Sequence, residues 1–166
     1  LQDFMCAQVK KNKAQDKIEN EPSLFDEALS ILLEFSNKPV EYIYYQEHVL
    51  LVQHLEAALK HASLSRREAV VEILLRLGRS YQIAVGNPVK SNQYLHDLLG
   101  LLNVNSSDLI AEISLLIAKN YRELQGKENI AESIRFATKA LTIYVRQNPQ
   151  NVKQLAATYK VLINSY

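Results

Sequence analysis

Apolar residues recur at intervals of three and four along most of the chain, a spacing typical of helices that bury one face. The first clear case begins after Glu21-Pro22-Ser23 and ends at Asn37-Lys38-Pro39. Ser23, three residues before Asp26, is a variant of the capping box that opens many helices. One face of this helix would carry Phe25, Ala28, Leu29, Leu32 and Leu33.

Turn-forming residues divide the rest of the chain into further helices. Gly86-Asn87-Pro88, Gln125-Gly126-Lys127 and Asn148-Pro149-Gln150-Asn151 are the plainest breaks. We expect helices at about 39–62, 65–85, 89–102, 108–124 and 129–146, and a last helix that ends at residue 166. No alternating strand pattern of useful length interrupts them. Short connections force neighbouring helices to run antiparallel, so the sequence predicts an all-α protein of about seven helices.

The first twenty residues differ from the rest. Residues 1–20 have a thin apolar pattern and several lysines, which indicates an isolated helix or a linker. We therefore expect a helical domain at 21–166 that follows this segment. The chain begins with Leu1 rather than Met, so we also expect it to be a segment of a longer protein.

Composition narrows the possible functions. Nineteen Lys and Arg balance eighteen Asp and Glu in 166 residues, so the chain lacks the basic excess of a nucleic-acid binder. No apolar run is long enough to span a membrane. The single cysteine, Cys6, excludes an intrachain disulfide framework and a cysteine zinc site. It fits a reducing compartment, and we expect a cytoplasmic protein.

The helices also share an internal spacing. Leu74-x2-Leu77-Gly78-x2-Tyr81 is matched by Ser114-x2-Ile117-Ala118-x2-Tyr121 and by Tyr159-x2-Leu162-Ile163-x2-Tyr166. The intervening helices align without gaps as Leu51-x3-Leu55-x2-Ala58-Leu59, Ser91-x3-Leu95-x2-Leu98-Leu99 and Ser133-x3-Ala137-x2-Ala140-Leu141. Small residues at such positions let two helices approach closely, while Leu and Tyr fill the groove between successive pairs.

This pattern, over about residues 22–166, resembles the tetratricopeptide repeat family, and Leu77-Gly78-x2-Tyr81 resembles it most closely. The resemblance implies an α-solenoid of stacked antiparallel helix hairpins. The copies, together with a weaker one at Phe25-x2-Ala28-Leu29-x2-Leu32, are spaced forty to forty-nine residues apart rather than the family's usual spacing of about 34. Ile163 is also bulky at the small position. A divergent array with long repeats, another helical-hairpin repeat and a closed bundle are the alternatives.

The resemblance also implies a binding surface, because the first helices of such arrays line a concave groove for a peptide or a helix. It places these residues on the groove: Glu72, Leu75, Arg79, Gln82, Glu112, Lys119, Arg122, Lys160 and Asn164. Arg79, Lys119 and Arg122 would give a basic groove for an acidic segment, and ordinary solvated charges are the alternative. The Lys160 and Asn164 pair resembles half of a carboxylate clamp. Tyr81 and Tyr121 are expected to pack between repeats.

Motifs for catalysis or metal binding are missing from the sequence. It has no Gly-rich phosphate loop, no Gly-x-Ser-x-Gly and no His-Glu-x-x-His. His48, His54 and His61 share one predicted helix, but their spacings of six and seven do not bring two imidazoles onto one ion. We therefore predict a non-enzymatic interaction scaffold with no cofactor, no metal and no catalytic residue.

An alternative is a regulatory or oligomerisation domain of a larger protein. The last helix shows apolar Leu155, Val161 and Leu162 with no following helix to cover them. Self-association through this helix would cover that surface.

Overall fold

The computed structural model describes residues 30–31, 34, 45–61, 67–103, 106–147 and 152–165. Every regular element in these ranges is helical, which confirms the all-α prediction for this part of the chain. Six helices follow one another there: α3 (Tyr45–His61), α4 (Arg67–Ser80) with its π-helical continuation η3 (Tyr81–Val85), α5 (Pro88–Leu101), α6 (Ser107–Leu124), α7 (Lys127–Gln147) and α8 (Val152–Ile163). The helix expected after Ser23 lies almost wholly outside the described residues, as do residues 1–20 and Cys6.

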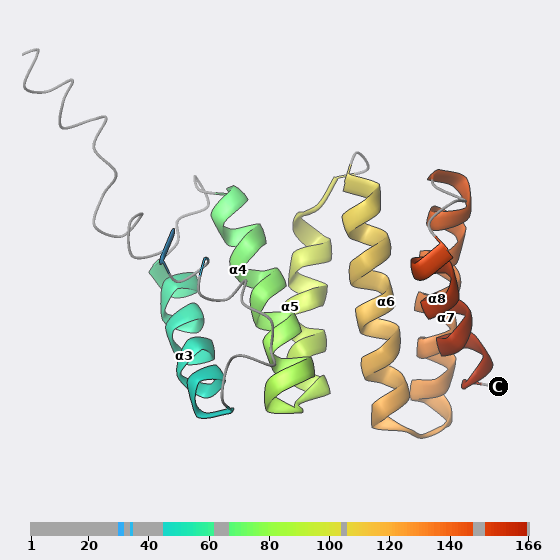
Figure 1. Ribbon diagram of the computed structural model, residues 1–166, viewed down its shortest axis with the longest axis horizontal. Helices are drawn as coiled ribbons and strands as arrows, with labels where there is room; N and C mark the ends of the chain where they lie inside the picture. The colour runs from blue at the N-terminus through green and yellow to red at the C-terminus, as the bar shows by residue number, and fades with distance from the viewer. Residues whose placement is uncertain are drawn as a thin grey trace, which may run out of the picture.

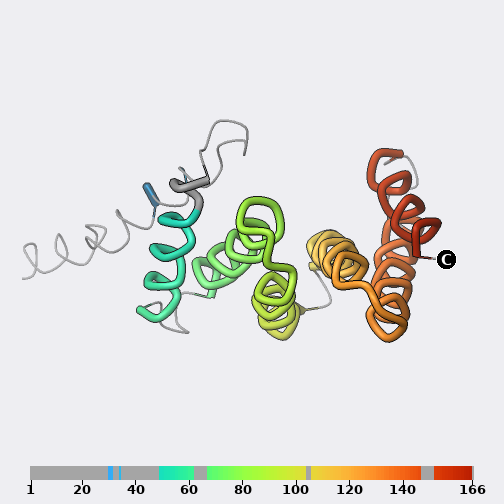
Figure 2. The backbone as a smooth tube through the Cα atoms, turned by 90° about the horizontal axis from the view of Figure 1, so that it is seen from below, coloured from blue at the N-terminus to red at the C-terminus, as the bar shows by residue number. Residues whose placement is uncertain are grey.

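Helices that are neighbours in sequence are also neighbours in space. Figure 1 shows them side by side in chain order, from α3 at one end to α7 and α8 at the other. Figure 2 shows the same order from a perpendicular direction. The contact between α6 and α7 is the most extensive, and α8 lies against α7 and also touches α6.

The break after η3 follows directly from three residues. Gly86 adopts a left-handed conformation (φ 67°), which favours glycine because it has no Cβ, and its N–H donates to the Tyr81 carbonyl. Asn87 then caps α5, since its Oδ1 accepts the Lys90 N–H at 3.0 Å. Pro88 stands at the start of α5, where a missing N–H costs nothing. The predicted break at 86–88 is confirmed, whereas the π-helical turn before it was not foreseen.

The other helix ends differ slightly from prediction. A tight turn at Gln125 (φ 54°) and Gly126 (φ 88°) separates α6 from α7, so α7 begins at Lys127, two residues before the predicted start. The last helix stops at Ile163 rather than at residue 166. A turn follows, in which the Ser165 N–H donates to the Leu162 carbonyl at 2.9 Å.

Buried apolar side chains form two clusters. The larger one runs from α4 to α8, and the smaller one joins α3 to α4 and η3 around the fully buried Leu55, Ile73 and Leu77. Gly78 is a point of close approach between α4 and α5, because a Cβ there would lie 2.4 Å from Cδ2 of Leu95. The role predicted for a small residue at this position is thus confirmed.

No helix in the described part of the chain combines the length and apolarity needed to cross a membrane.

Candidate interaction surface

Long polar side chains connect α4 with α6. The Arg79 guanidinium forms an ion pair with the Glu112 carboxylate. Gln82 Nε2 donates to Asn120 Oδ1 at 2.7 Å and to the Leu116 carbonyl at 3.2 Å. Two of the predicted binding residues, Arg79 of α4 and Gln82 of η3, are therefore brought together on the side that faces α6.

The charges on this surface are mixed. The side chains of Arg79 and Glu112 are 34% and 37% exposed, so their ion pair is open to solvent and screened by it. Lys119 lies one turn after Leu116 and so shares the face of α6 that carries Glu112, and it is half-buried. Glu123, exposed four residues further on, belongs to the same face and was missed in the sequence. Its spacing from Lys119 was the available signal.

The remaining predicted residues are more scattered. Glu72 forms an ion pair with Arg76 of its own helix, with Oε1 2.6 Å from Nη2. Arg122 is half-buried on α6, and Lys160 and Asn164 are exposed at the end of α8. The prediction of Leu75 as a groove residue was wrong, because its side chain is buried in the larger apolar cluster.

A buried polar network lies beneath this surface. Asn120 is fully buried, and its Nδ2 donates to Ser91 Oγ at 2.7 Å and to Asn92 Oδ1 at 2.8 Å. Ser91 Oγ in turn donates to the Gly78 carbonyl at 2.7 Å. Buried polar groups need such partners, because leaving one unsatisfied costs about 1–3 kcal/mol. A backbone carbonyl of α4, a serine of α5 and a side chain of α6 are thus joined in series.

A similar arrangement occurs about forty residues later, with Ser165 in place of Asn120, although the Ser165 hydroxyl itself donates to the Val161 carbonyl. Ser133 Oγ of α7 donates to the Ala118 carbonyl of α6 at 2.8 Å. Ser133 Oγ is also 3.1 Å from Oγ of Ser165, which follows α8. Ser91 and Ser133 were aligned from the sequence alone, and so were Gly78 and Ala118. The polar link from each serine to the next helix could not be foreseen.

A carboxylate and two tyrosines connect α3 to η3 and α5. Glu56 Oε1 accepts hydrogen bonds from the Tyr81 hydroxyl at 2.7 Å and from the Tyr94 hydroxyl at 2.8 Å. The two rings are stacked, with centroids 5.7 Å apart. Lys90 Nζ lies 5.0 Å from the centroid of the Tyr81 ring and 3.9 Å from Glu56 Oε1. Tyr81 is buried, as predicted, but its bond to Glu56 was missed because 25 residues separate the two.

The protonation states in this cluster follow from its contacts. The hydrogen bond from Tyr81 holds the pKa of Glu56 below its ordinary value, although burial opposes the shift. Burial, with the adjacent carboxylate, raises the pKa of Tyr81 to about 12 and shifts the pKa of Tyr94 upward as well. At neutral pH the cluster is an ionised carboxylate held by two protonated phenols. That state suits it to anchoring helices rather than to transferring protons.

The histidines have no common site. His96 lies against two aromatic rings, with centroid distances of 5.4 Å to Phe136 and 6.5 Å to Tyr121, and burial lowers its pKa. His54 and His61 are exposed on α3, and the side chain of His48 lies outside the described residues. Among the residues that the structure does describe, no three His, Cys, Asp or Glu side chains are grouped as metal ligands.

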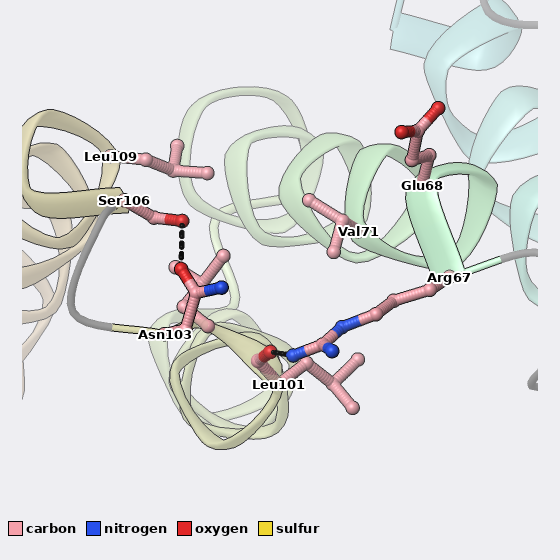
Figure 3. Close-up of a pocket in the computed structure, with 8 residues that line it drawn as sticks. Arg67, Glu68, Val71, Leu101, Asn103, Ser106 and Leu109 are labelled. Carbon is pink, nitrogen blue, oxygen red and sulfur yellow. Dashed lines mark hydrogen bonds between the residues drawn. The ribbon is translucent and has the colours of Figure 1, made fainter.

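A cavity of about 370 Å³ lies at the start of α4 and beside the connection from α5 to α6. Figure 3 shows Arg67 reaching across to the end of α5, where it donates to the Leu101 carbonyl. Ser106 Oγ donates to Asn103 Oδ1 at 3.1 Å on the opposite wall. Val71 and Leu109 also line it. Because Arg67 satisfies a terminal helix carbonyl, its role here is structural.

Comparison with protein-family models, with curated proteins and with solved structures finds no significant match to this chain. The tetratricopeptide-like interpretation therefore stays a prediction. A functional proposal has to rest on the contacts described above.

Proposed function

We propose that this chain is a protein-interaction scaffold: an array of antiparallel helix pairs, similar to tetratricopeptide repeats, that binds a peptide or a helix of a partner protein. The recurrent carbonyl–serine–polar bond series is the observation that supports it most. The series joins Gly78, Ser91 and Asn120 in one pair and Ala118, Ser133 and Ser165 in the next. Such nearest-neighbour links are typical of stacked repeats, in which each unit is stabilised by the next.

The α4–α6 surface, which carries Arg79, Gln82, Glu112 and Lys119, is the proposed binding face. It presents half-exposed polar side chains rather than apolar ones, so it suits a charged, extended segment. The solvent-open Arg79–Glu112 pair is able to exchange its internal contact for contacts with a ligand. Arg122, Lys160 and Asn164 would add contacts further along the array. The proposal includes no catalytic step, metal, cofactor or nucleic acid, and it places the protein in the cytoplasm.

The test compares purified variants as baits in affinity purification from native cells, followed by mass spectrometry. Lys119→Glu should reduce recovery of a specific partner about tenfold, equivalent to about 1.4 kcal/mol of binding energy. The double exchange Arg79→Glu with Glu112→Arg keeps an internal ion pair but reverses its polarity, so it should also weaken binding while leaving Tm unchanged. Lys139→Glu, exposed on α7, is the control.

Two outcomes would count against this face. If both α4–α6 variants recover the same partners as the wild type, the binding face lies elsewhere. If Lys139→Glu abolishes recovery as fully as Lys119→Glu does, the effect reflects overall charge rather than a site.

A regulatory or oligomerisation domain is the second candidate, and it is favoured by exposed apolar side chains on α8. The three residues named for this role from the sequence do not provide the surface, because Val161 is buried and Leu155 and Leu162 pack against the larger apolar cluster. Instead, Ile163 is 72% exposed and Tyr159 is 49% exposed. Self-association through α8 would make the sedimentation coefficient rise with concentration. A constant monomeric value across the accessible range would exclude this role.

A further inference from the structure

The outer face of α8 carries a continuous apolar stripe. Val152, Ala156, Tyr159 and Ile163 are all exposed, and Val152 and Ile163 are more than 70% exposed. Their spacings of four, three and four residues place them on one seam, as in helices that pack against another helix. The opposite side of α8 holds the buried Thr158 and Val161. The helix thus has one covered side and one uncovered apolar side.

The recurrent bond series shows which surface of α6 corresponds to this stripe. Asn120 and Ser165 occupy the same place in the two series and are 45 residues apart. The same offset aligns Ala156, Tyr159 and Ile163 with Ala111, Ser114 and Ala118 of α6, and all three α6 residues are fully buried. The Ala118 carbonyl accepts the bond from Ser133 of α7.

The same comparison extends to α4. Gly78 and Ala118 are equivalent, and Gly78 lies under Leu95 of α5. In α6, therefore, the three residues that correspond to the α8 stripe are buried, and in α4 the residue that corresponds to Ile163 lies under the next helix. A helix is the occupant that the geometry of this surface fits.

The charges beside the stripe indicate which kind of helix could bind to it. Lys153 and Lys160 are exposed beside the stripe, and α8 has no acidic residue. A second copy packed by a two-fold axis would bring the lysines of one α8 towards those of the other, which is repulsive. Acidic side chains on the incoming helix would instead form pairs with both lysines and exclude basic competitors.

We propose that the outer face of α8 binds one amphipathic helix of a partner protein, with an apolar stripe and with Asp or Glu beside it. The proposal rests on the repeat alignment that supports the proposed function, but it concerns the outer face of α8, which shares only Lys160 with the residues assigned to the proposed function.

Shape adds a further requirement. Ile163 stands where α4 has Gly78, and even a Cβ at Gly78 would meet Leu95 at 2.4 Å. A helix with a large residue opposite Ile163 would therefore be held away. The partner should carry Ala, Gly or Ser there. In α7 the residue aligned with Leu95 is Ala137, which is buried.

A suitable probe is a labelled peptide with the α7 sequence, residues 127–147, in which each basic residue is replaced by Glu. The four replaced residues are Lys127, Arg135, Lys139 and Arg146. We expect fluorescence anisotropy to show saturable binding to the 166-residue chain. The unmodified α7 peptide should bind at least about tenfold more weakly, and so should the acidic peptide with Ala137→Leu.

Substitutions in the chain locate the site. Ile163→Asp should weaken binding of the acidic peptide by at least about tenfold, because it places a charge within the apolar contact. Lys153→Glu with Lys160→Glu should weaken the acidic peptide and strengthen the unmodified one. Val89→Asp, on a similarly exposed apolar residue of α5, should leave binding unchanged. Circular dichroism should show native helicity for each variant, because the substituted side chains are exposed.

Three results would overturn this proposal. The first is acidic-peptide binding that Ile163→Asp leaves intact, or no binding at all. The second is a wild-type dimer in sedimentation that Ile163→Asp converts to monomer, which would show that a second copy covers α8. The third is loss of peptide binding in Lys119→Glu, which would place the peptide on the α4–α6 surface. The proposed function would then stand, and the proposed site on α8 would be wrong.

Discussion

Among single residues, the sequence predicted where a small side chain is needed for helix packing, but it did not predict which polar side chains are buried. The role of Gly78 as a point of close approach was visible in the sequence, because a glycine inside an apolar helix needs a packing reason. The buried network around Asn120 was not visible. Its partners Ser91 and Asn92 are 29 and 28 residues away, and only the contact between α5 and α6 brings them within hydrogen-bond distance.

Gly78→Ala should destabilise the protein, although alanine is the better helix former. The added Cβ would lie 2.4 Å from Cδ2 and 2.7 Å from Cγ of Leu95, which is fully buried. Overpacking of this kind costs about 1–3 kcal/mol, more than the roughly 1 kcal/mol gained in helix propensity. We therefore expect a net loss of up to about 2 kcal/mol in the free energy of unfolding, measured with urea.

Gly100→Ala is the matched control, because it lies in α5 with no atom within 4 Å of its added Cβ. It should leave stability unchanged or raise it by less than about 1 kcal/mol. Equal effects of the two substitutions would show that α4 and α5 are not in close contact at Gly78.

At the scale of the helices, boundaries could be predicted where single residues determine them. Gly86, Asn87 and Pro88 end one helix and start the next through their own conformational preferences. The π-helical turn of η3 was not predictable, since no residue within it requires that conformation, and the turn lies against α3 and α5. That turn contains Tyr81, which bonds to Glu56 of α3.

The Glu56 cluster should make the attachment of α3 sensitive to alkaline pH. The pKa of Tyr81 is raised from 10 to about 12 by folding. Below pH 10 the hydroxyl is protonated in both states and its contribution to stability is complete. Between pH 10 and about 12 the unfolded chain loses this proton first, so the free energy of unfolding should fall. The urea midpoint measured across this window checks the direction.

Tyr81→Phe should make that decline shallower without abolishing it, because the pKa values of Tyr94 and Tyr144 are also raised. It should also lower stability at neutral pH, since Glu56 loses a donor. Tyr121→Phe is the control, because the Tyr121 ring stacks on Phe136 and Tyr121 is not one of the tyrosines that bond to Glu56. An identical alkaline decline in the wild type and in Tyr81→Phe would contradict the assigned pKa.

At the scale of the whole molecule, the helical class followed from the periodicity of apolar residues. The arrangement of charges did not. Helix periodicity placed Arg79 and Lys119 on polar faces, but the ion pair of Arg79 with Glu112 depends on how α4 and α6 lie relative to each other. The sequence therefore indicated which residues are polar and accessible, and left open which of them are already paired.

The two apolar clusters imply that the chain does not open as one unit. The buried residues of α3 belong to the smaller cluster, which α3 shares with α4 and η3, and its half-buried Leu59 packs against both clusters. By contrast, α6 and α7 share the most extensive contact and lie in the larger cluster. Regions with fewer buried contacts open at lower free energy. Native-state hydrogen exchange should therefore show α3 amides exchanging by a partial opening while α6 and α7 stay protected.

Paired substitutions make the expectation specific. Leu55→Ala removes a fully buried side chain of α3, at a cost of about 2–5 kcal/mol, and should reduce protection in α3 and α4 while leaving α6 and α7 nearly unchanged. Ile117→Ala makes a comparable cavity in α6 and should reduce protection in α6 and α7, because it lies in the cluster that joins them. If Leu55→Ala lowered protection equally in every helix, the described helices would unfold as a single cooperative body. Links between neighbouring helices would then be too strong for the part of the chain around α3 to open alone.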